Sequence, residues 1–354
     1  MVVGLVCYKQ ELGGSLSYVK ALYALKKIYD CRLILFGNPL TKNLFKHCDW
    51  IDVSLDLGNL DRLDIKAQYE RLDLINAYKC DYLIATTTSE AHVKFLLASN
   101  ARRIVCATKL YSLLSPRCLT VPIYTFKKYH SMSSENIMLS FARRISPRRF
   151  DRGVASLDFS ACALEAGEAA RDRIRDFLSR AWPSYPYRRK DKTKPPCLVL
   201  VNPFNVNNPF SLSLPYWIKL ASEVARLPGC RPVIVSFPAV RAILQEGLEA
   251  VGGMGEILVF ENDEEILNLV ALVEEVSCVI SPSTGTIHLA SNLGVPTIGL
   301  YAKWDLGRWG TRDGRYVFIP DVRDRLDDRT QEGLVLESLE ALKGVLGVDS
   351  KIFS

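Results

Sequence analysis

Short apolar runs alternate with helical patterns along the first half of the chain. A β-branched run at residues 2–7 predicts a buried strand, and apolar residues at helical spacing over 16–29 predict a helix. A second apolar run at 31–36 ends in a Gly-Asn-Pro turn signal. Strand, helix and strand in this short distance form a βαβ unit, which builds a parallel sheet.

The same alternation continues along the chain and restarts after a proline-rich boundary. The first half adds expected strands at 51–53, 82–85 and 103–107 and expected helices at 66–77, 90–99 and 133–144, the last capped by Ser133 or Ser134. Residues 181–196 hold four prolines and no apolar periodicity, which is typical of an extended linker. Beyond it we expect strands at 197–201, 232–237, 257–260, 276–280 and 297–301, and helices at 216–226, 240–251, 264–273 and 286–293.

This pattern predicts an α/β fold with two doubly wound domains in tandem. We expect a first domain at 1–180, a linker at 181–196 and a second domain at 197–354, whose last helix can pack back on the first domain. The length of 354 residues and the hydrophobic share of 48% suit two cores. Doubly wound domains bind ligands beyond the carboxyl ends of their strands, so a cleft between the domains is the expected site.

Composition and charge argue against several classes of protein. No apolar run approaches the roughly 18 residues of a membrane span, and residues 1–7 suit a strand better than a signal peptide, so we expect a cytoplasmic protein. The ten cysteines form no Cys-x-x-Cys pair, which indicates reduced core thiols and no metal site. The net charge of +6 is concentrated in residues 143–194, with 14 basic and 7 acidic residues. That segment carries no nucleic-acid motif, so no nucleic-acid partner is expected.

The most informative segment spans residues 279–300. A buried strand ends in Ser-Pro-Ser-Thr-Gly, a short helix begins there, and Gly-Val-Pro stops it before the next strand. The free amides of Thr284, Gly285 and Thr286, with the positive end of the helix dipole, form a small anion site. Ser283 and Thr284 add hydroxyl donors, and Gly285 lets a phosphate approach the backbone. From these residues alone, an ordinary Ser/Thr helix cap is an equally good interpretation.

The same segment resembles the C-terminal signature of glycosyltransferase family nine, the heptosyltransferase family. The matching residues are Ser283-Thr284-Gly285, His288-Leu289-Ala290 and Leu293-Gly294-Val295-Pro296, followed by an apolar strand. The resemblance implies a GT-B-like fold, in which two Rossmann-like domains face a central cleft. It also implies that the second domain binds the nucleotide-sugar, with its diphosphate and sugar on residues 283–286, and that the first binds the acceptor. His288 falls on the family histidine, and we interpret it as a packing or hydrogen-bonding residue.

A second family pattern, near the first strand, is altered in this chain. The stretch Glu11-Leu12-Gly13-Gly14-Ser15 replaces the family's Leu/Ile-Gly-Asp, and Gly14 occupies the position of the Asp that the resemblance implies as general base. Gly13, Gly14 and Ser15 keep a tight acceptor-side loop but supply no base. Glu11, on the same loop, is the candidate catalytic base, and an ordinary exposed glutamate is the alternative.

A third family region, the loop after the first strand of the second domain, also departs from the pattern. The Lys that the resemblance brings to the phosphates is replaced by Leu212. The candidate donors in this loop are Asn207, Asn208 and Ser211, which lack the charge-assisted strength of a lysine. Lys303 or Arg308, from a later loop, can replace the lysine, with a solvated cation as the alternative for both.

The resemblance implies a metal-independent, inverting glycosyltransferase that needs no cofactor. We expect a nucleotide-sugar donor, ADP-heptose, and a lipopolysaccharide-core or related glycolipid or oligosaccharide acceptor. Because the family Asp and Lys are missing, a non-catalytic nucleotide-sugar or glycan-binding protein and a nucleotide-sugar epimerase stay open as alternatives. If the acceptor is an anionic glycolipid, the basic segment 143–194 is where we expect contact with it or with the inner membrane surface. The alternative is a solvated helix face followed by a soluble linker.

Overall fold

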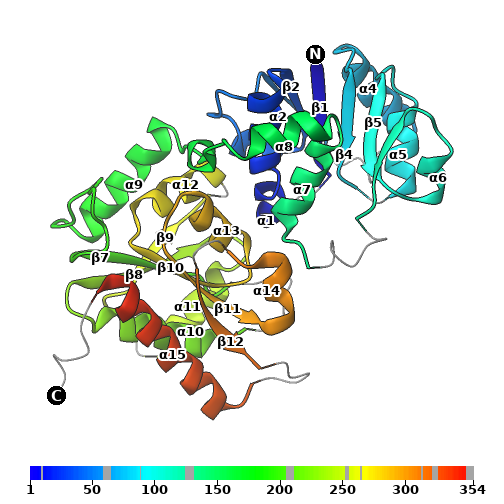
Figure 1. The fold of residues 1–354 in the computed structure, drawn as a ribbon. Coiled ribbons are helices and arrows are strands. Elements are labelled where there is room, and N and C mark those ends of the chain that lie inside the picture. The colour runs from blue at the N-terminus through cyan, green and yellow to red at the C-terminus, as the bar shows by residue number, and fades with distance from the viewer. Residues whose placement is uncertain are drawn as a thin grey trace. The chain divides into compact units, whose positions relative to one another are not determined.

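Each half of the chain builds one parallel sheet of six strands in the computed structural model. Contacts divide the chain into two units, Met1–Leu164 and Glu165–Ser354. In Figure 1 the first runs from blue to green and the second from green to red. The structure describes residues 1–8, 11–58, 65–87, 89–123, 131–204, 211–251, 255–263, 265–311, 314–320 and 326–347.

The first sheet has the strand order β3-β2-β1-β4-β5-β6. Its strands are β1 (Val2–Val6), β2 (Arg32–Gly37), β3 (Val53–Asp56), β4 (Tyr82–Ala85), β5 (Arg103–Ala107) and β6 (Cys118–Val121). The helices of this unit are α1 (Leu12–Leu16), α2 (Val19–Tyr29), α3 (Pro39–Leu44), α4 (Ile65–Asn76), α5 (Glu90–Leu97), α6 (Leu110–Leu113), α7 (Ser134–Arg143) and α8 (Pro147–Val154), with the 3₁₀ helix η3 (Phe159–Cys162). The winding direction reverses between the neighbours β1 and β4, which makes their carboxyl ends the topological switch point.

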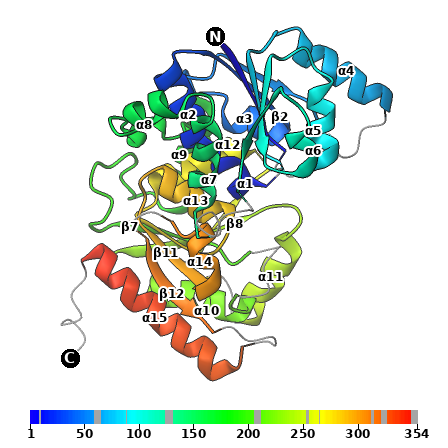
Figure 2. The same ribbon diagram turned by 45° about the vertical axis from the view of Figure 1, so that its right-hand side comes forward.

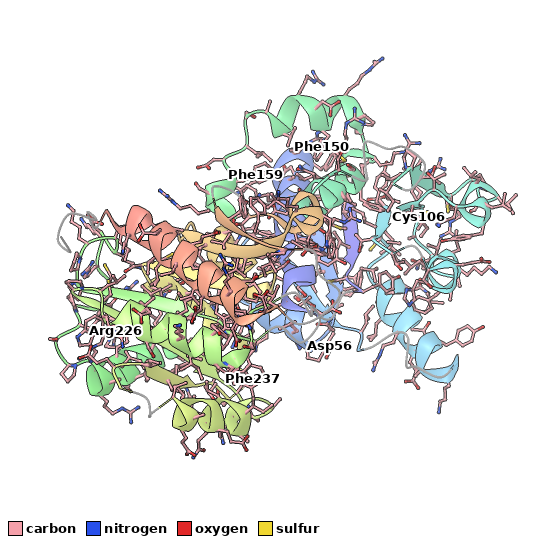
Figure 3. The ribbon with its side chains drawn as sticks, turned by 90° about the horizontal axis from the view of Figure 1, so that it is seen from below. Asp56, Cys106, Phe150, Phe159, Arg226 and Phe237 are labelled. Atoms are coloured by element: carbon pink, nitrogen blue, oxygen red, sulfur yellow. The ribbon has the colours of Figure 1, made fainter. Side chains whose placement is uncertain are left out.

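Helices cover both faces of the first sheet (Figures 1 and 2). On one face α2 packs against α7 and α8, and α7 is capped by Ser133, whose hydroxyl accepts from the Asn136 N–H at 3.3 Å. Phe150 on α8 and Phe159 on η3, both labelled in Figure 3, belong to the layer around α2. On the other face α4 and α5 bury residues such as Ile75 against the strands. The predicted doubly wound arrangement of the first half is confirmed.

The second sheet repeats this topology, with the order β12-β11-β10-β7-β8-β9. Its strands are β7 (Cys197–Val201), β8 (Cys230–Ser236), β9 (Leu258–Glu261), β10 (Cys278–Pro282), β11 (Thr297–Ala302) and β12 (Arg315–Ile319). The helices of this unit are α9 (Glu168–Ala181), α10 (Leu214–Ala225), α11 (Arg241–Ala250), α12 (Ile266–Glu275), α13 (Gly285–Asn292), α14 (Lys303–Trp309) and α15 (Asp328–Leu346). The switch point of this sheet lies between β7 and β10.

The last helix, α15, packs against α10 and the second sheet. Its residues Leu334 and Leu342 share one core with Trp217 of α10 and with strand residues such as Ile280. We expected that this helix can pack back on the first domain. Its apolar face lies instead in the core of its own unit.

The boundary between the units differs from the expected one at residue 180. α9, assigned to the first domain from sequence, packs on α12, where Arg171 Nε lies 2.8 Å from Glu274 Oε2. The expected linker 181–196 also lies in the second unit, where two of its three aromatic side chains are buried. Trp182 and Tyr185 are each 8% exposed, and the Tyr185 hydroxyl donates to the Glu275 carbonyl at 2.9 Å. The proline-rich segment is therefore part of the second unit and not a free connection.

The ten cysteines are all free thiols, and all except Cys118 are buried. Burial raises the pKa of the Cys80 and Cys106 thiols to about 12, so neither carries a thiolate near neutral pH. Among the helices of the described ranges, none combines the length and apolar character needed to cross a membrane.

Candidate functional site

Three polar side chains converge at the switch point of the second sheet. Asn202, directly after β7, donates from Nδ2 to Ser281 Oγ at 3.0 Å and to Thr284 Oγ1 at 3.1 Å. The two hydroxyls lie 2.8 Å apart. The Asn202 backbone N–H donates to the Ile280 carbonyl at 2.9 Å. Because β7 and β10 are neighbours, residues distant in the chain hold the loop after β10 in one conformation.

This loop leads into α13, whose first turn is free of a side-chain cap within the described structure. Thr284 is the N-cap residue, with φ −133° and ψ 170°, but its side chain makes no capping hydrogen bond. Its hydroxyl is engaged by Asn202 and Ser281 instead. The ordinary Ser/Thr cap, an open alternative in the sequence, is therefore not formed. The first-turn amides, including those of Gly285 and Thr286, have no capping side chain and can donate to an anion, and the helix dipole adds positive potential there.

Ser283 connects the same loop to the next strand and helix. Its hydroxyl hydrogen-bonds the carboxyl of Asp305 on α14 and the hydroxyl of Tyr301 at the end of β11. Burial raises the pKa of Asp305, and the hydrogen bond from Ser283 opposes that rise. The Tyr301 hydroxyl also donates to the Trp309 carbonyl at 3.0 Å. Ser283 is thus fixed in position, and its half-buried side chain stays at the rim of the site.

Lys303 begins α14 at the carboxyl end of β11, the strand beside β10. The side chain is exposed, and its ammonium lies 5.7 Å from the centroid of the Phe318 ring. It stays the candidate cation of the site, one strand away from Thr284. His288 on α13 contacts Trp309 edge-on, with ring centroids 5.8 Å apart, in line with a packing role.

The loop after β7 is described only in part. Asn207 and Asn208 lie outside the described residues. The Ser211 hydroxyl accepts from Trp217 Nε1 at 3.0 Å, so it holds the start of α10. Leu212, at the position of the family lysine, is 4% exposed and belongs to the core of the second unit. A lysine at this position would have to leave a buried apolar setting to reach a phosphate.

The acceptor-side loop expected in the first unit forms the short helix α1. Glu11 precedes it and is exposed, and its side chain makes no cap hydrogen bond in the described structure. Gly13 and Gly14 lie inside α1. Ser15 is fully buried, and its hydroxyl donates to the Glu11 carbonyl at 3.0 Å. The structure therefore brings Glu11 and the two glycines together on one turn and directs Ser15 inward.

Sequence reasoning missed several residues at the two switch points. Asn202 carried only a weak signal, a single polar residue after a buried strand. In the first unit, Tyr8 after β1 stacks on His92 of α5, with ring centroids 4.2 Å apart. His92 Nδ1 lies 3.3 Å from the Thr87 hydroxyl, after β4. The contact between the polar residues after β1 and those after β4 could have been predicted only with the knowledge that these two strands are neighbours.

Many cations of the basic segment 143–194 are bound within the fold. Arg143 forms a two-point ion pair with Asp151, at 2.6 and 2.7 Å. Arg171 pairs with Glu274, and Arg173 lies 3.2 Å from Asp263. Other partners are backbone carbonyls, as for Arg149, which donates to Ile28 at 2.9 Å. The basic side chains of this segment therefore partly stabilise the packing of helices and loops. They do not form a single surface of free cations.

The comparison with protein families matches the segment that forms this site. A sequence model of glycosyltransferase family 9 (heptosyltransferase) matches residues 264–325, which contain α12, β10, the Thr284 loop, α13 and α14. The resemblance to glycosyltransferase family 9 is confirmed. The match covers the second unit in part, and no curated protein matches the chain in sequence.

Solved structures of family 9 proteins share the whole fold. A family 9 glycosyl transferase from Veillonella parvula is 15% identical with a TM-score of 0.77, covering 98% of each chain. The E. coli ADP-heptose lps heptosyltransferase II is 13% identical with a TM-score of 0.74, covering 98% of this chain and 99% of its own. The E. coli heptosyltransferase WaaC with ADP is 15% identical with a TM-score of 0.64, covering 96% and 100%. At this identity the likeness establishes the two-domain, GT-B-like α/β fold.

Replacing Asn202 with leucine tests the polar network. We expect nucleoside diphosphate affinity to fall about tenfold, because the Thr284 loop loses its two side-chain hydrogen bonds to Asn202, and stability to fall by about 1–2 kcal/mol. Calorimetric titration and urea unfolding measure the two effects. The matched control is Asn268→Leu, which removes a different amide of this unit, a buried one that bonds Asn262 and Asp263 away from the site. Equal affinity losses in both variants would contradict a local role for Asn202.

Proposed function

We propose that the protein is a glycosyltransferase that moves a sugar from a nucleotide-sugar to a glycan acceptor. The observation that carries the proposal is the uncapped first turn of α13, held at the switch point of the second sheet by Asn202, Ser281 and Thr284. Such a turn is an anion site, and a diphosphate is the anion that a nucleotide-sugar presents. The family 9 match over residues 264–325 and the shared fold support this assignment.

The proposed chemistry is transfer with the second unit holding the leaving diphosphate. Backbone amides and the helix dipole stabilise the negative charge that develops on the diphosphate as the glycosidic bond breaks, so the reaction needs no resident metal or cofactor. Lys303, at the end of β11, is the proposed cation on the same edge of the sheet. Direct attack by an acceptor hydroxyl on the face opposite the diphosphate would invert the anomeric centre.

The donor we propose is ADP-heptose and the acceptor a lipopolysaccharide-core or related saccharide. Solved relatives support the choice, since one is an ADP-heptose lps heptosyltransferase and another was solved with ADP-2-deoxy-2-fluoro heptose. A thermal-shift and titration panel with ADP, UDP, GDP and CDP tests the base. We expect ADP to bind most tightly, and preference for another nucleotide would overturn the heptose donor.

Glu11 is the proposed general base for the acceptor hydroxyl. With glycine at position 14, it is the carboxylate of the described acceptor-side loop. Glu11→Gln is expected to lower kcat by about a hundredfold or more, as loss of a general base does, while the KM for the donor stays unchanged. Transfer from ADP-heptose to saccharide extract is the assay. Glu70→Gln, another exposed glutamate of the same unit, serves as control, and equal activity of both variants with wild type would remove Glu11 from the mechanism.

Two features favour a second candidate, a binding protein without turnover. Gly14 stands where the family resemblance places a base, and the core residue Leu212 stands where it places a phosphate-binding lysine. Such a protein would bind the nucleoside diphosphate and the sugar nucleotide without consuming either. Tight binding of the sugar nucleotide, with no transfer of its sugar to any acceptor extract, would show that the protein is a binding protein and not a glycosyltransferase. Epimerisation of the free donor, a third alternative, would appear as a new sugar nucleotide in mixtures without acceptor.

A further inference from the structure

The short helix α6 of the first unit and the residue that follows it present leucines to solvent. Leu110, Leu113 and Leu114 are 78%, 62% and 79% exposed. Its fully buried residue is polar: Ser112 donates to the Lys109 carbonyl at 2.8 Å and accepts from the Lys109 N–H at 2.9 Å. A protein surface seldom turns three neighbouring leucines outward while burying a serine, so this cluster indicates a contact with an apolar partner.

The segment that carries these leucines is firmly attached to the first unit. The Arg117 guanidinium donates to the Leu97 carbonyl at 2.8 Å and to the Ser99 carbonyl at 2.9 Å. Arg103 of β5 donates to the Pro116 carbonyl at 2.5 Å. In Figure 1, α6 lies at the rim of the first unit, beside α5. These hydrogen bonds therefore fix the segment in the position that exposes the leucines.

The sequence on either side of α6 is rich in basic residues. Between Glu90 and Glu135 the chain has seven basic residues and no acidic one. Glu90, the acidic residue nearest to this stretch on its N-terminal side, is paired with Lys94 at 2.6 Å. A surface that combines exposed leucines with a local surplus of basic residues suits a partner that is apolar below an anionic layer.

A cavity lined by two arginines lies near α6, at the carboxyl ends of β5 and β6. Thr108, which follows β5 and stands two residues before α6, lines a cavity of about 640 Å³. The cavity is also lined by Ser140 and Arg143 of α7 and by Arg144, the residue after this helix. Asp151 fixes the Arg143 guanidinium through two hydrogen bonds, which orients it. A phosphate group near α6 would find hydroxyl and guanidinium donors in this cavity.

We propose that the leucine surface formed by Leu110, Leu113 and Leu114 docks the first unit onto an anionic lipid bilayer. The leucines enter the boundary between headgroups and acyl chains, and the surrounding cations bind lipid phosphates. Three side chains offer far less area than the roughly 800 Å² per partner of a stable protein interface, whereas a lipid surface needs only a few apolar anchors with basic neighbours. This inference does not depend on the proposed function, since lipid binding requires no nucleotide.

Vesicle flotation at low salt, with phosphatidylcholine alone and with added phosphatidylglycerol, tests the proposal on the full chain. We expect the wild type to bind the mixed vesicles and to be released by salt. The variant Leu110→Ser/Leu113→Ser/Leu114→Ser is expected to bind them at least about tenfold more weakly. Leu336→Ser is the matched control, because Leu336 on α15 is 64% exposed but lies in the second unit. Arg144→Glu is expected to weaken binding to the mixed vesicles and leave the binding to phosphatidylcholine alone unchanged.

The proposal is overturned if the wild-type protein does not float with the anionic vesicles, or if the Leu336→Ser variant loses as much binding as the triple variant. It is also overturned if the triple variant binds the vesicles as the wild type does. If that variant then also changes its oligomeric state in gel filtration, the leucines belong to a contact with a second copy of the chain. Because the three leucines are exposed, thermal unfolding of the triple variant is expected to match the wild type and exclude misfolding as the cause.

Discussion

Gly285→Val is expected to weaken ADP binding by about a hundredfold, because the valine side chain stands where a phosphate must approach the first turn of α13. The estimate corresponds to the loss of about two charge-assisted hydrogen bonds of ~1.5 kcal/mol each. Gly285 is the first residue of α13, and Thr284 before it provides no side-chain cap in the described structure. Isothermal titration with ADP measures the effect.

Two further variants make this experiment specific. Gly285→Ala adds only one methyl group, so its loss of affinity is expected to be smaller than that of valine. Thr286→Val keeps the backbone amide and changes only the side chain, so it is expected to retain most of the affinity. If Gly285→Val binds ADP as tightly as the wild type while the protein stays folded, the diphosphate does not lie on α13.

Trp217→Ala is expected to destabilise the second unit by about 3–5 kcal/mol, the usual cost of removing a large buried aromatic side chain. Trp217 is fully buried on α10, in the core that also contains Ile280 and Leu342, and its indole N–H donates to Ser211. Urea unfolding followed by circular dichroism measures the loss. Trp304→Ala is the control, because Trp304 on α14 is 58% exposed. A Trp217→Ala loss no larger than that of the control would contradict the packing of α10 in this core.

The strands inside the two sheets could be predicted well from the sequence. The expected strands 82–85, 103–107 and 197–201 match β4, β5 and β7, because these segments are buried on both faces and appear as continuous apolar runs. β6 and β12 were not predicted. Both lie at sheet edges, where part of each strand faces solvent and the apolar run is broken. The other two edge strands, β3 and β9, were predicted at 51–53 and 257–260, so an edge position weakens the local signature without removing it.

The candidate site was predicted in part. The loop from Ser283 to Thr286 could be chosen as the candidate site because a turn, a helix start and a family signature coincide in one short segment. Asn202 was missed, because its role depends on a hydrogen bond to Thr284, 82 positions away. The assignment of Leu212 to the core could not be made either, since an apolar residue in a loop can be exposed or buried depending on what packs over it.

By itself, the sequence determined the fold class of this protein, the two parallel sheets and the segment that resembles family 9. These follow from local patterns of apolar residues and turn residues, which involve positions close together in the sequence. Only the tertiary structure decided that α9 and residues 182–196 belong to the second unit. It also decided that Thr284 bonds Asn202 and does not cap α13. The outward position of the leucines at α6 is likewise a result of the tertiary structure. Each of these depends on contacts between residues far apart in the chain, and such contacts exist only once the strand order brings the residues together.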